Sequence, residues 1–138
     1  HDGKVTVWLA GPSGVVASGD VATVKAWIEA NKPGTDDVTT GADSGVKSAS
    51  ANVVSLMATI TVAATSDSTA NRARATDALA TYFAALDIAE DVDLGRLYEC
   101  LYAAAGVLDA DIVQPSTDAS INNGEIATLS TMLTWVVV

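Results

Sequence analysis

The sequence of 138 residues has few of the side chains that carry most protein chemistry. It contains one histidine, His1, and one cysteine, Cys100. A single cysteine excludes an intrachain disulfide. The only histidine is the terminal residue His1, so a multi-histidine metal site is excluded and Ser-His or Cys-His nucleophile pairs are not expected. Cys100 lies in a predicted helix, where a free cysteine behaves as a small apolar residue. We therefore expect a protein that is not an enzyme, with no catalytic residue, metal or cofactor.

Positive charge and long apolar runs are also scarce. The chain has 7 basic and 17 acidic residues, a net charge of −10, and only 17% charged residues in all. An acidic field repels phosphate backbones, so we expect no nucleic-acid partner. Although 49% of the residues are hydrophobic, no run reaches the 18 or so residues that would span a bilayer, and we expect no membrane insertion. An acidic surface favours solubility or a basic partner.

Three short motifs suggest ligand binding but lack the residues that it requires. The acidic pairs Asp91/Asp93 and Asp109/Asp111 have too few neighbouring oxygen ligands for a calcium loop. Asp93 is better placed as a helix cap, and the second pair points to the solvent side of a strand. The segment Gly11–Gly14 has no following lysine, so it predicts a turn and not a phosphate-binding loop.

Hydrophobic periodicity predicts an α+β fold in the order β-α-β-β-α-α-β-β, with a mixed or antiparallel sheet and about three helices packed on it. The arrangement is ferredoxin-like in part. We expect one unit over residues 1–138, with an N-terminal β-α-β lobe at about 1–45 and a C-terminal β-α-α-β-β lobe at about 46–138. The expected strands are Lys4–Ala10, Asp37–Thr40, Val53–Val62, Val107–Val113 and Ala127–Val138. The expected helices are Asp20–Asn31 with Asp20 as its cap, Ser68–Leu86 with caps at Ser66–Ser68, and Asp93–Ala105.

The residues between the second and third strands, Gly41–Ala51, are rich in Gly, Ser and Ala and predict a link. In the first helix, helical spacing predicts that Trp27 belongs to the core together with its apolar neighbours. For the rest of the chain, the same periodicities predict a core at one helix–sheet interface. Its expected members are Val54, Leu56, Ile60, Leu79, Phe83, Leu97 and Leu101.

Several segments in sequence order resemble the C-terminal part of the baseplate J family, the Mu-type baseplate wedge proteins of contractile phage tails. The segments are Gly3–Val7, Val21–Ile28, Asp37–Thr39, Ala58–Val62, Ala80–Leu86, Leu94–Tyr98, Ala105–Val107 and Gly124–Leu129. The resemblance implies a structural component of the virion tail baseplate, assembled in the cytoplasm of the bacterial host. It also implies packing against other baseplate subunits and against a second copy, without catalytic residues. A chain that begins at His1 is expected to be a fragment of a longer protein.

An assembly protein needs apolar surface for its partners, and four residues are the candidates. Trp8 lies on the opposite strand face from Val7 and Leu9, and aromatic residues are enriched at interfaces. Trp135, Val136 and Val137 form a poorly alternating apolar end to the last strand. The alternatives are a small acidic ligand- or glycan-binding module without catalysis and, in third place, a small acidic enzyme.

Overall fold

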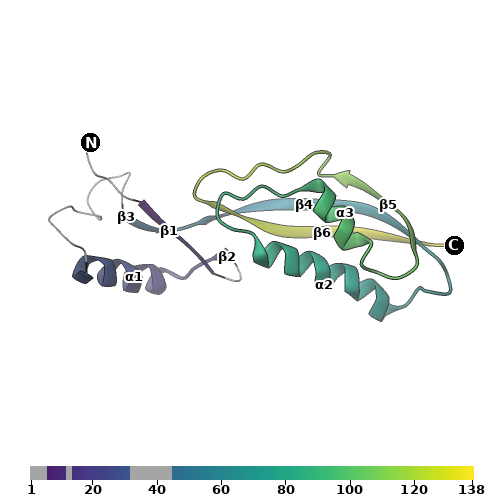
Figure 1. Ribbon diagram of the computed structural model, residues 1–138, viewed down its shortest axis with the longest axis horizontal. Coiled ribbons are helices and arrows are strands. Elements are labelled where there is room, and N and C mark those ends of the chain that lie inside the picture. Colours follow the sequence, from purple (N-terminus) through teal and green to yellow (C-terminus); the bar gives the residue numbers. More distant parts are fainter. Residues whose placement is uncertain (1–5, 12–13, 32–44) are drawn as a thin grey trace.

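Two three-stranded sheets follow one another along the long axis of the molecule (Figure 1). The computed structural model describes residues 6–11, 14–31 and 45–138. In the N-terminal sheet, β1 (Thr6–Gly11) pairs antiparallel with β2 (Gly14–Val15) and parallel with β3 (Gly45–Ser48). Helix α1 (Ser18–Asn31) packs beside β3. The predicted strand Asp37–Thr40 lies outside the described residues.

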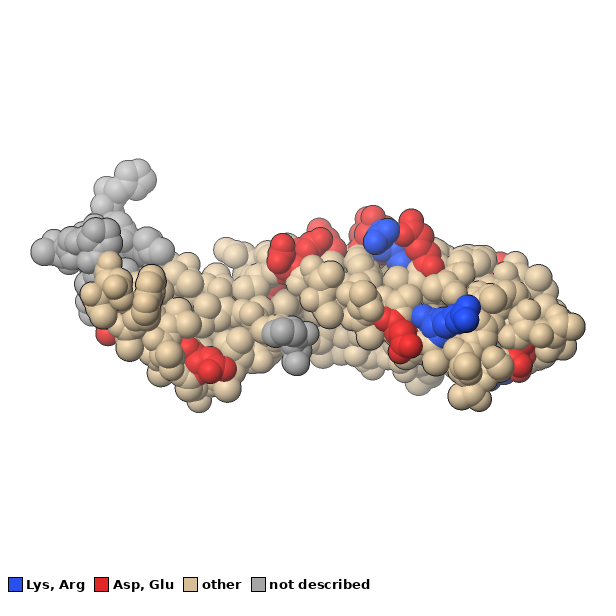
Figure 2. All heavy atoms as spheres, turned by 60° about the horizontal axis from the view of Figure 1, so that its bottom comes forward, with Lys and Arg blue, Asp and Glu red and all other residues tan. Residues whose placement is uncertain are grey.

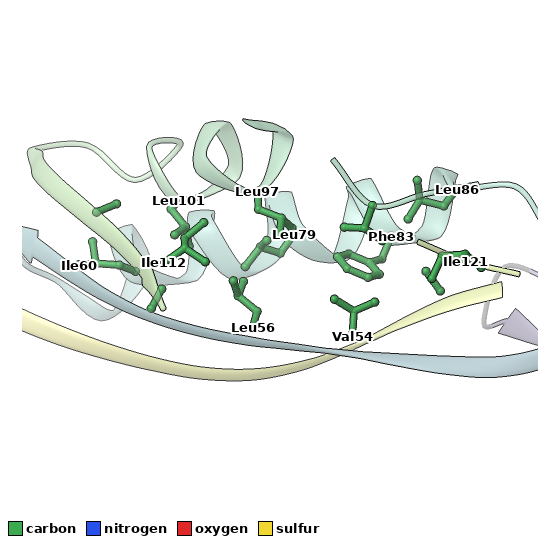
Figure 3. Close-up of a cluster of buried hydrophobic side chains, with 14 residues drawn as sticks. Val54, Leu56, Ile60, Leu79, Phe83, Leu86, Leu97, Leu101, Ile112 and Ile121 are labelled. Atoms are coloured by element: carbon green, nitrogen blue, oxygen red, sulfur yellow. The ribbon is translucent and has the colours of Figure 1, made fainter. Parts of the chain in front are cut away.

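The C-terminal sheet has the order β5-β4-β6, with β4 (Ser50–Val62) in the centre. Strand β5 (Val107–Gln114) runs antiparallel to β4, and β6 (Glu125–Val137) runs parallel to it. Helices α2 (Thr69–Ala85) and α3 (Leu94–Leu101) cover one face of this sheet (Figures 1 and 3). The predicted α+β class and the order of the elements are confirmed, and the strands divide between two sheets.

The alternation of β4 explains why helices cover only one face. Side chains on a strand point alternately to its two faces. In β4 the even-numbered residues from Val54 to Val62 are buried, whereas Val53, Ser55 and Met57 are exposed. The buried set meets the apolar side of α2 and α3 in one continuous core (Figure 3). All seven predicted core residues are buried: Val54, Leu56, Ile60, Leu79, Phe83, Leu97 and Leu101.

Side-chain caps begin both helices of the C-terminal sheet. The Ser68 side chain accepts a hydrogen bond from the Asn71 amide, and the Asp93 side chain accepts from the amides of Gly95 and Arg96. Each cap satisfies amides that lack partners within the first helical turn. The caps predicted at Ser68 and Asp93 are confirmed, and Asp93 therefore has a structural use.

The N-terminal sheet departs from the sequence predictions in three places. Trp27 is 66% exposed and does not belong to a core. At 100° per residue it lies about a quarter turn from the half-buried Val21, Val24 and Ile28, which face the narrow sheet. Helix α1 begins at Ser18, so Asp20 lies in its first turn and is not its cap. Within the predicted link at Gly41–Ala51, residues 45–48 form β3 and β4 starts at Ser50, because pairing with β1 compensates for weak strand propensity.

In the described part of the chain, no helix is both long enough and apolar enough to cross a membrane.

Candidate protein–protein interface

The structure separates the four predicted interface residues into two places. Trp8 lies at the junction of the two sheets, beside Gly124 at the start of β6. Trp135, Val136 and Val137 lie near the other end of β6. With a rise of about 3.3 Å per residue, the 11 steps from Gly124 to Trp135 span roughly 36 Å. These residues therefore do not form one patch.

Trp8 is half-buried because it forms part of the joint between the sheets. A Cβ atom added at Gly124 would lie only 2.6 Å from Cζ2 of Trp8, so the indole rests directly on the glycine backbone. Gly124 has a φ of +82°, which a residue with a side chain rarely adopts. On the other side, Lys47 Nζ lies 5.6 Å from the centroid of the Trp8 ring, within the range of a cation–π contact.

Beside Trp8 opens a cleft of about 630 Å³ between β1 and the C-terminal end of α2. Its walls are Trp8–Gly11 on one side and Ala84–Ile88 on the other, with Ile126 between them. Apart from Asp87, the residues that line this cleft are apolar. The exposed part of Trp8 thus faces a concave surface formed by both halves of the molecule.

Trp135 faces the helices and packs against the core of its own chain. It is in register with the buried Ile60, and parallel neighbours in register present their side chains on the same face. The Arg72 guanidinium lies 5.3 Å from the Trp135 ring centroid. Arg72 also donates to both carboxylate oxygens of Asp67, at 2.6 and 2.8 Å, and this hydrogen bonding raises the pKa of Arg72. Trp135 is therefore largely an internal residue.

Val136 and Val137 are more exposed than Trp135, but they lie on opposite faces of β6. Val136 is 40% exposed and lies on the open face of the sheet, in register with Thr61. Val137 is 44% exposed and lies on the helix side, beside the end of the core. Of the predicted C-terminal residues, Val136 is the one that contributes to a flat exposed surface.

That surface, the open face of the β5-β4-β6 sheet, was missed as a site by the sequence predictions. Its apolar residues are Val53, Met57, Met132 and Val136, with exposed fractions of 61, 37, 64 and 40%. Between them lie hydroxyl side chains of β4 and β6, and the exposed carboxylates of Asp109 and Asp111 border the face along β5. No Lys or Arg lies on the described strands of this sheet. The signal was present in the alternation of β4 and β6, which places one apolar row on each face.

An acidic cleft of about 520 Å³ lies between the end of α2 and the start of α3. Its carboxylates are engaged with backbone amides of their own chain. Asp118 accepts from the Leu94 amide at 2.8 Å, and Asp91 accepts from the Ile121 amide at 2.7 Å. The Tyr82 hydroxyl accepts from the Asp93 amide at 3.0 Å, and burial is the main cause that raises the pKa of Tyr82. The carboxylates that line this cleft therefore cap backbone amides and hold the loops around α3 in place.

Two further polar residues have structural contacts that the sequence did not reveal. Asn71 is buried and joins α2 to the turn after α3, donating to the Ala105 carbonyl and accepting from the Ala105 amide at 2.7 Å. Glu125 accepts hydrogen bonds from the Asn52 side chain at 2.8 Å and from Asn122, which lowers the pKa of its carboxyl group. This network attaches the start of β6 to the start of β4.

In the described part of the chain, the side chains that could act as nucleophiles or metal ligands do not gather into one site. Burial raises the pKa of the Cys100 thiol, which is the reverse of what an activated nucleophile requires. Among residues 6–11, 14–31 and 45–138, no three His, Cys, Asp or Glu side chains gather closely enough to hold a metal ion. His1 lies outside the described residues. Asp109 and Asp111 are exposed on the open face, as predicted.

Comparison with known proteins adds one positive finding. Residues 54–135 match the family model described as Baseplate J-like protein C-terminal domain. The match covers more than half of the chain, from the first buried residue of β4 to Trp135 near the end of β6. The resembling segments that precede residue 54 lie outside the matched range. None of the curated proteins matches the chain.

Proposed function

The chain belongs to the Baseplate J-like protein C-terminal domain family, and from this membership we propose that it is a wedge component of a contractile phage-tail baseplate. The family implies a structural role in a phage baseplate and association with other baseplate proteins. The more specific part of the proposal is that the chain works through packing of its surfaces against neighbouring subunits, without catalysis.

The observation that carries the proposal is the open face of the β5-β4-β6 sheet. Helices cover one side of this sheet, whereas the other side exposes four large apolar side chains among hydroxyl groups. Exposed apolar surface of this kind is a common mark of protein–protein contact sites. The carboxylates of the acidic cleft between α2 and α3, by contrast, are engaged as caps, which favours a structural role over a ligand site there.

The expected partners are other baseplate subunits and a second copy of the chain. A net charge of −10 favours partners with basic surfaces and disfavours nucleic acid. On the side shown in Figure 2, acidic residues form small separate groups within a mostly uncharged surface, which is compatible with close packing. We place the protein in the tail baseplate, assembled in the host cytoplasm, with no insertion into a membrane.

We also propose that the chain is organised as two lobes, residues 1–45 and 46–138, within one structural unit. The two sheets support a division in this region, although the first sheet ends with β3 at Ser48, a few residues after the proposed boundary, and the second begins with β4 at Ser50. The family match begins at residue 54 and lies entirely in the second lobe. The proposed structural function is accordingly assigned to that lobe.

Purified tails from the source phage or tail-like particle provide the main test. We expect the protein to co-purify with baseplates and to cross-link to baseplate subunits through residues of the open face. Lysines introduced by Val53→Lys and Met132→Lys should abolish incorporation without unfolding the chain. Asp77→Lys on the exposed side of α2 is the matched control. Normal incorporation of the two open-face variants would contradict the proposal.

The alternative, a small acidic ligand- or glycan-binding module, rests on the cleft beside Trp8. A thermal-shift panel of glycans, nucleotides and divalent metals distinguishes the two functions. A ligand at 100 times its Kd stabilises the folded protein by about 2.7 kcal/mol. Stabilisation by a glycan that is lost in Trp8→Ala would favour the binding module over the structural protein.

A further inference from the structure

The two edges of the β5-β4-β6 sheet are built differently. An edge strand presents unpaired backbone groups, and natural proteins block such edges with charges, bulges or proline. Strand β5 has all three: Asp109 and Asp111, two register shifts against β4, and Pro115 directly after its last residue. Strand β6 pairs with β4 in unbroken register and contains no charge or proline from Ile126 to Val137.

The hydrogen bonds show which backbone groups of β6 point to this edge. The Ser50 amide donates to the Gly124 carbonyl at 3.0 Å, and the Val138 amide donates to the Val62 carbonyl at 3.0 Å. Even-numbered residues of β6 therefore bond toward β4. Because successive residues of a strand direct their backbone groups to opposite sides, the odd-numbered residues direct theirs away from β4. Along the later part of the strand these are Leu129, Thr131, Leu133, Trp135 and Val137.

The later part of β6 is also accessible. Thr131 lies on the helix side of the strand and is exposed, so α2 does not shield the edge there. Met132, on the open side, is 64% exposed. Near the start of β6, Gly14 of β2 approaches Ile126 and Thr128, where a Cβ on the glycine would lie 3.4 Å from the Thr128 methyl group. The free stretch is therefore residues 129–137, whose midpoint is Leu133.

We propose that a second copy of the chain pairs its own β6 antiparallel with this edge, around a two-fold axis near Leu133. The proposal rests on the structural function proposed above and names the strand through which two copies meet. Pairing about Leu133 places Leu129 opposite Val137 and Thr131 opposite Trp135 on the helix side. On the open side it places Met132 opposite Thr134, and each of these pairs is free of charge. The two open faces then join into one six-stranded surface.

The later part of β6 is itself uncharged and therefore fits a second copy as the occupant, although each copy is acidic overall. Two molecules of net charge −10 repel one another unless their acidic groups stay apart. In the order β5-β4-β6-β6-β4-β5, Asp109 and Asp111 of the two copies lie on opposite margins. Five strand spacings of about 4.8 Å separate the margins by roughly 24 Å, which is about three Debye lengths at physiological salt. Pairing through β5 would place the same carboxylates side by side.

Sedimentation velocity of residues 1–138 over a range of concentrations tests the pairing. We expect a reversible dimer whose Kd rises at least about tenfold in Thr131→Pro, because proline removes an outward N–H and leaves the β4 ladder intact. Thr131→Ala keeps that N–H and is the matched control, with a Kd within about twofold of the original. If Thr131→Pro fails to fold, Met132→Lys combined with Thr134→Lys brings like charges together across the pair. Ser55→Lys, on the same face of the central strand, is its control.

Two results would overturn the inference while leaving the structural function open. The first is a chain that stays monomeric at all concentrations, and the second is a dimer that none of these edge variants weakens. Absence of the original chain from purified baseplates, or normal incorporation of Val53→Lys and Met132→Lys, would instead count against the proposed function.

Spin labels test the geometry of the pairing directly. They are attached to Met132→Cys or to Asp109→Cys, each in a Cys100→Ala chain. The two labels at 132 should lie within about 15 Å of one another, and those at 109 should be at least roughly 24 Å apart. The opposite order of distances would show packing through β5 and overturn the β6 pairing.

Discussion

The two lobes of the molecule reach their folded form with very different amounts of buried surface. In the C-terminal lobe, one cluster of buried residues joins β4, β5, α2 and α3 (Figure 3). In the N-terminal lobe, α1 has no buried residue, and its tryptophan faces solvent. Since burial of apolar surface is the main favourable contribution to folding, the C-terminal lobe supplies most of the stability. The N-terminal lobe is held by strand pairing and by the joint at Trp8.

The largest expected effect is a core truncation in the C-terminal lobe. Leu79 is fully buried, and Leu79→Ala should lower the free energy of unfolding by about 2–5 kcal/mol through lost packing and a residual cavity. Val24→Ala in α1 should cost less than about 1 kcal/mol, because Val24 is only half-buried. Urea unfolding measures both. Equal costs would remove the distinction between the lobes.

The next effect concerns the joint between the lobes. Gly124→Val should destabilise the protein by about 1–3 kcal/mol, because valine is strained at a φ of +82° and its Cβ would collide with Trp8. Trp8→Ala relieves the collision but not the strain, so the double variant should recover part of the loss. Full additivity in this double-mutant cycle would show that Trp8 and Gly124 are not coupled.

A smaller effect is expected where Arg72 covers Trp135. Arg72→Met removes the pairing with Asp67 and the cation–π contact but keeps much of the aliphatic packing. Both groups are partly exposed, so the loss of unfolding free energy should be clearly smaller than that caused by Leu79→Ala. Trp135 fluorescence should shift in the folded state, and the Trp8→Phe/Trp27→Phe background isolates this signal. An unchanged spectrum would contradict the contact.

The smallest effect is a pH dependence at Glu125. Its pKa is lowered, first by the Asn52 hydrogen bond, so its contribution to stability is fully present above the unfolded value of about 4.3. That contribution is lost as the pH falls through the lower, folded pKa. The difference in unfolding free energy between the original chain and Glu125→Gln should therefore shrink in acid. A difference that stays constant down to about pH 3 would show that the carboxylate network adds nothing.

The same contrast between the lobes explains how much the sequence could predict. In β4 and α2 the local periodicity and the tertiary burial agree, so the predicted core residues Val54, Leu79 and Phe83 are all buried. In α1 the apolar residues occupy more of the helix circumference than the narrow N-terminal sheet can cover. The prediction that Trp27 belongs to the core is therefore wrong, because Trp27 lies on the exposed side of the helix. Strand β3 has weak propensity and depends on its pairing with β1, a long-range contact that no local pattern contains.

For the candidate site, sequence could indicate apolar surface but not its partners. Trp8 and Trp135 are predicted interface residues, yet Trp8 rests on Gly124 and Trp135 lies beneath Arg72. Both contacts join residues far apart in the sequence. The open face was encoded by the alternation of β4 and β6, but only the structure shows that α2 and α3 both lie on the other face and that β2 approaches it at Ile126 and Thr128.

The direct continuation of β3 into β4 has a mechanical consequence. Only Ala49, which is 1% exposed and donates to the Leu9 carbonyl at 2.8 Å, separates the two strands. Tension between the N-terminal sheet and the far end of β6 would therefore pass along β4 with no slack linker to extend. Because β4 and β6 are parallel and paired along their whole length, such a load acts on their hydrogen bonds in shear. The bonds then resist together instead of opening one by one.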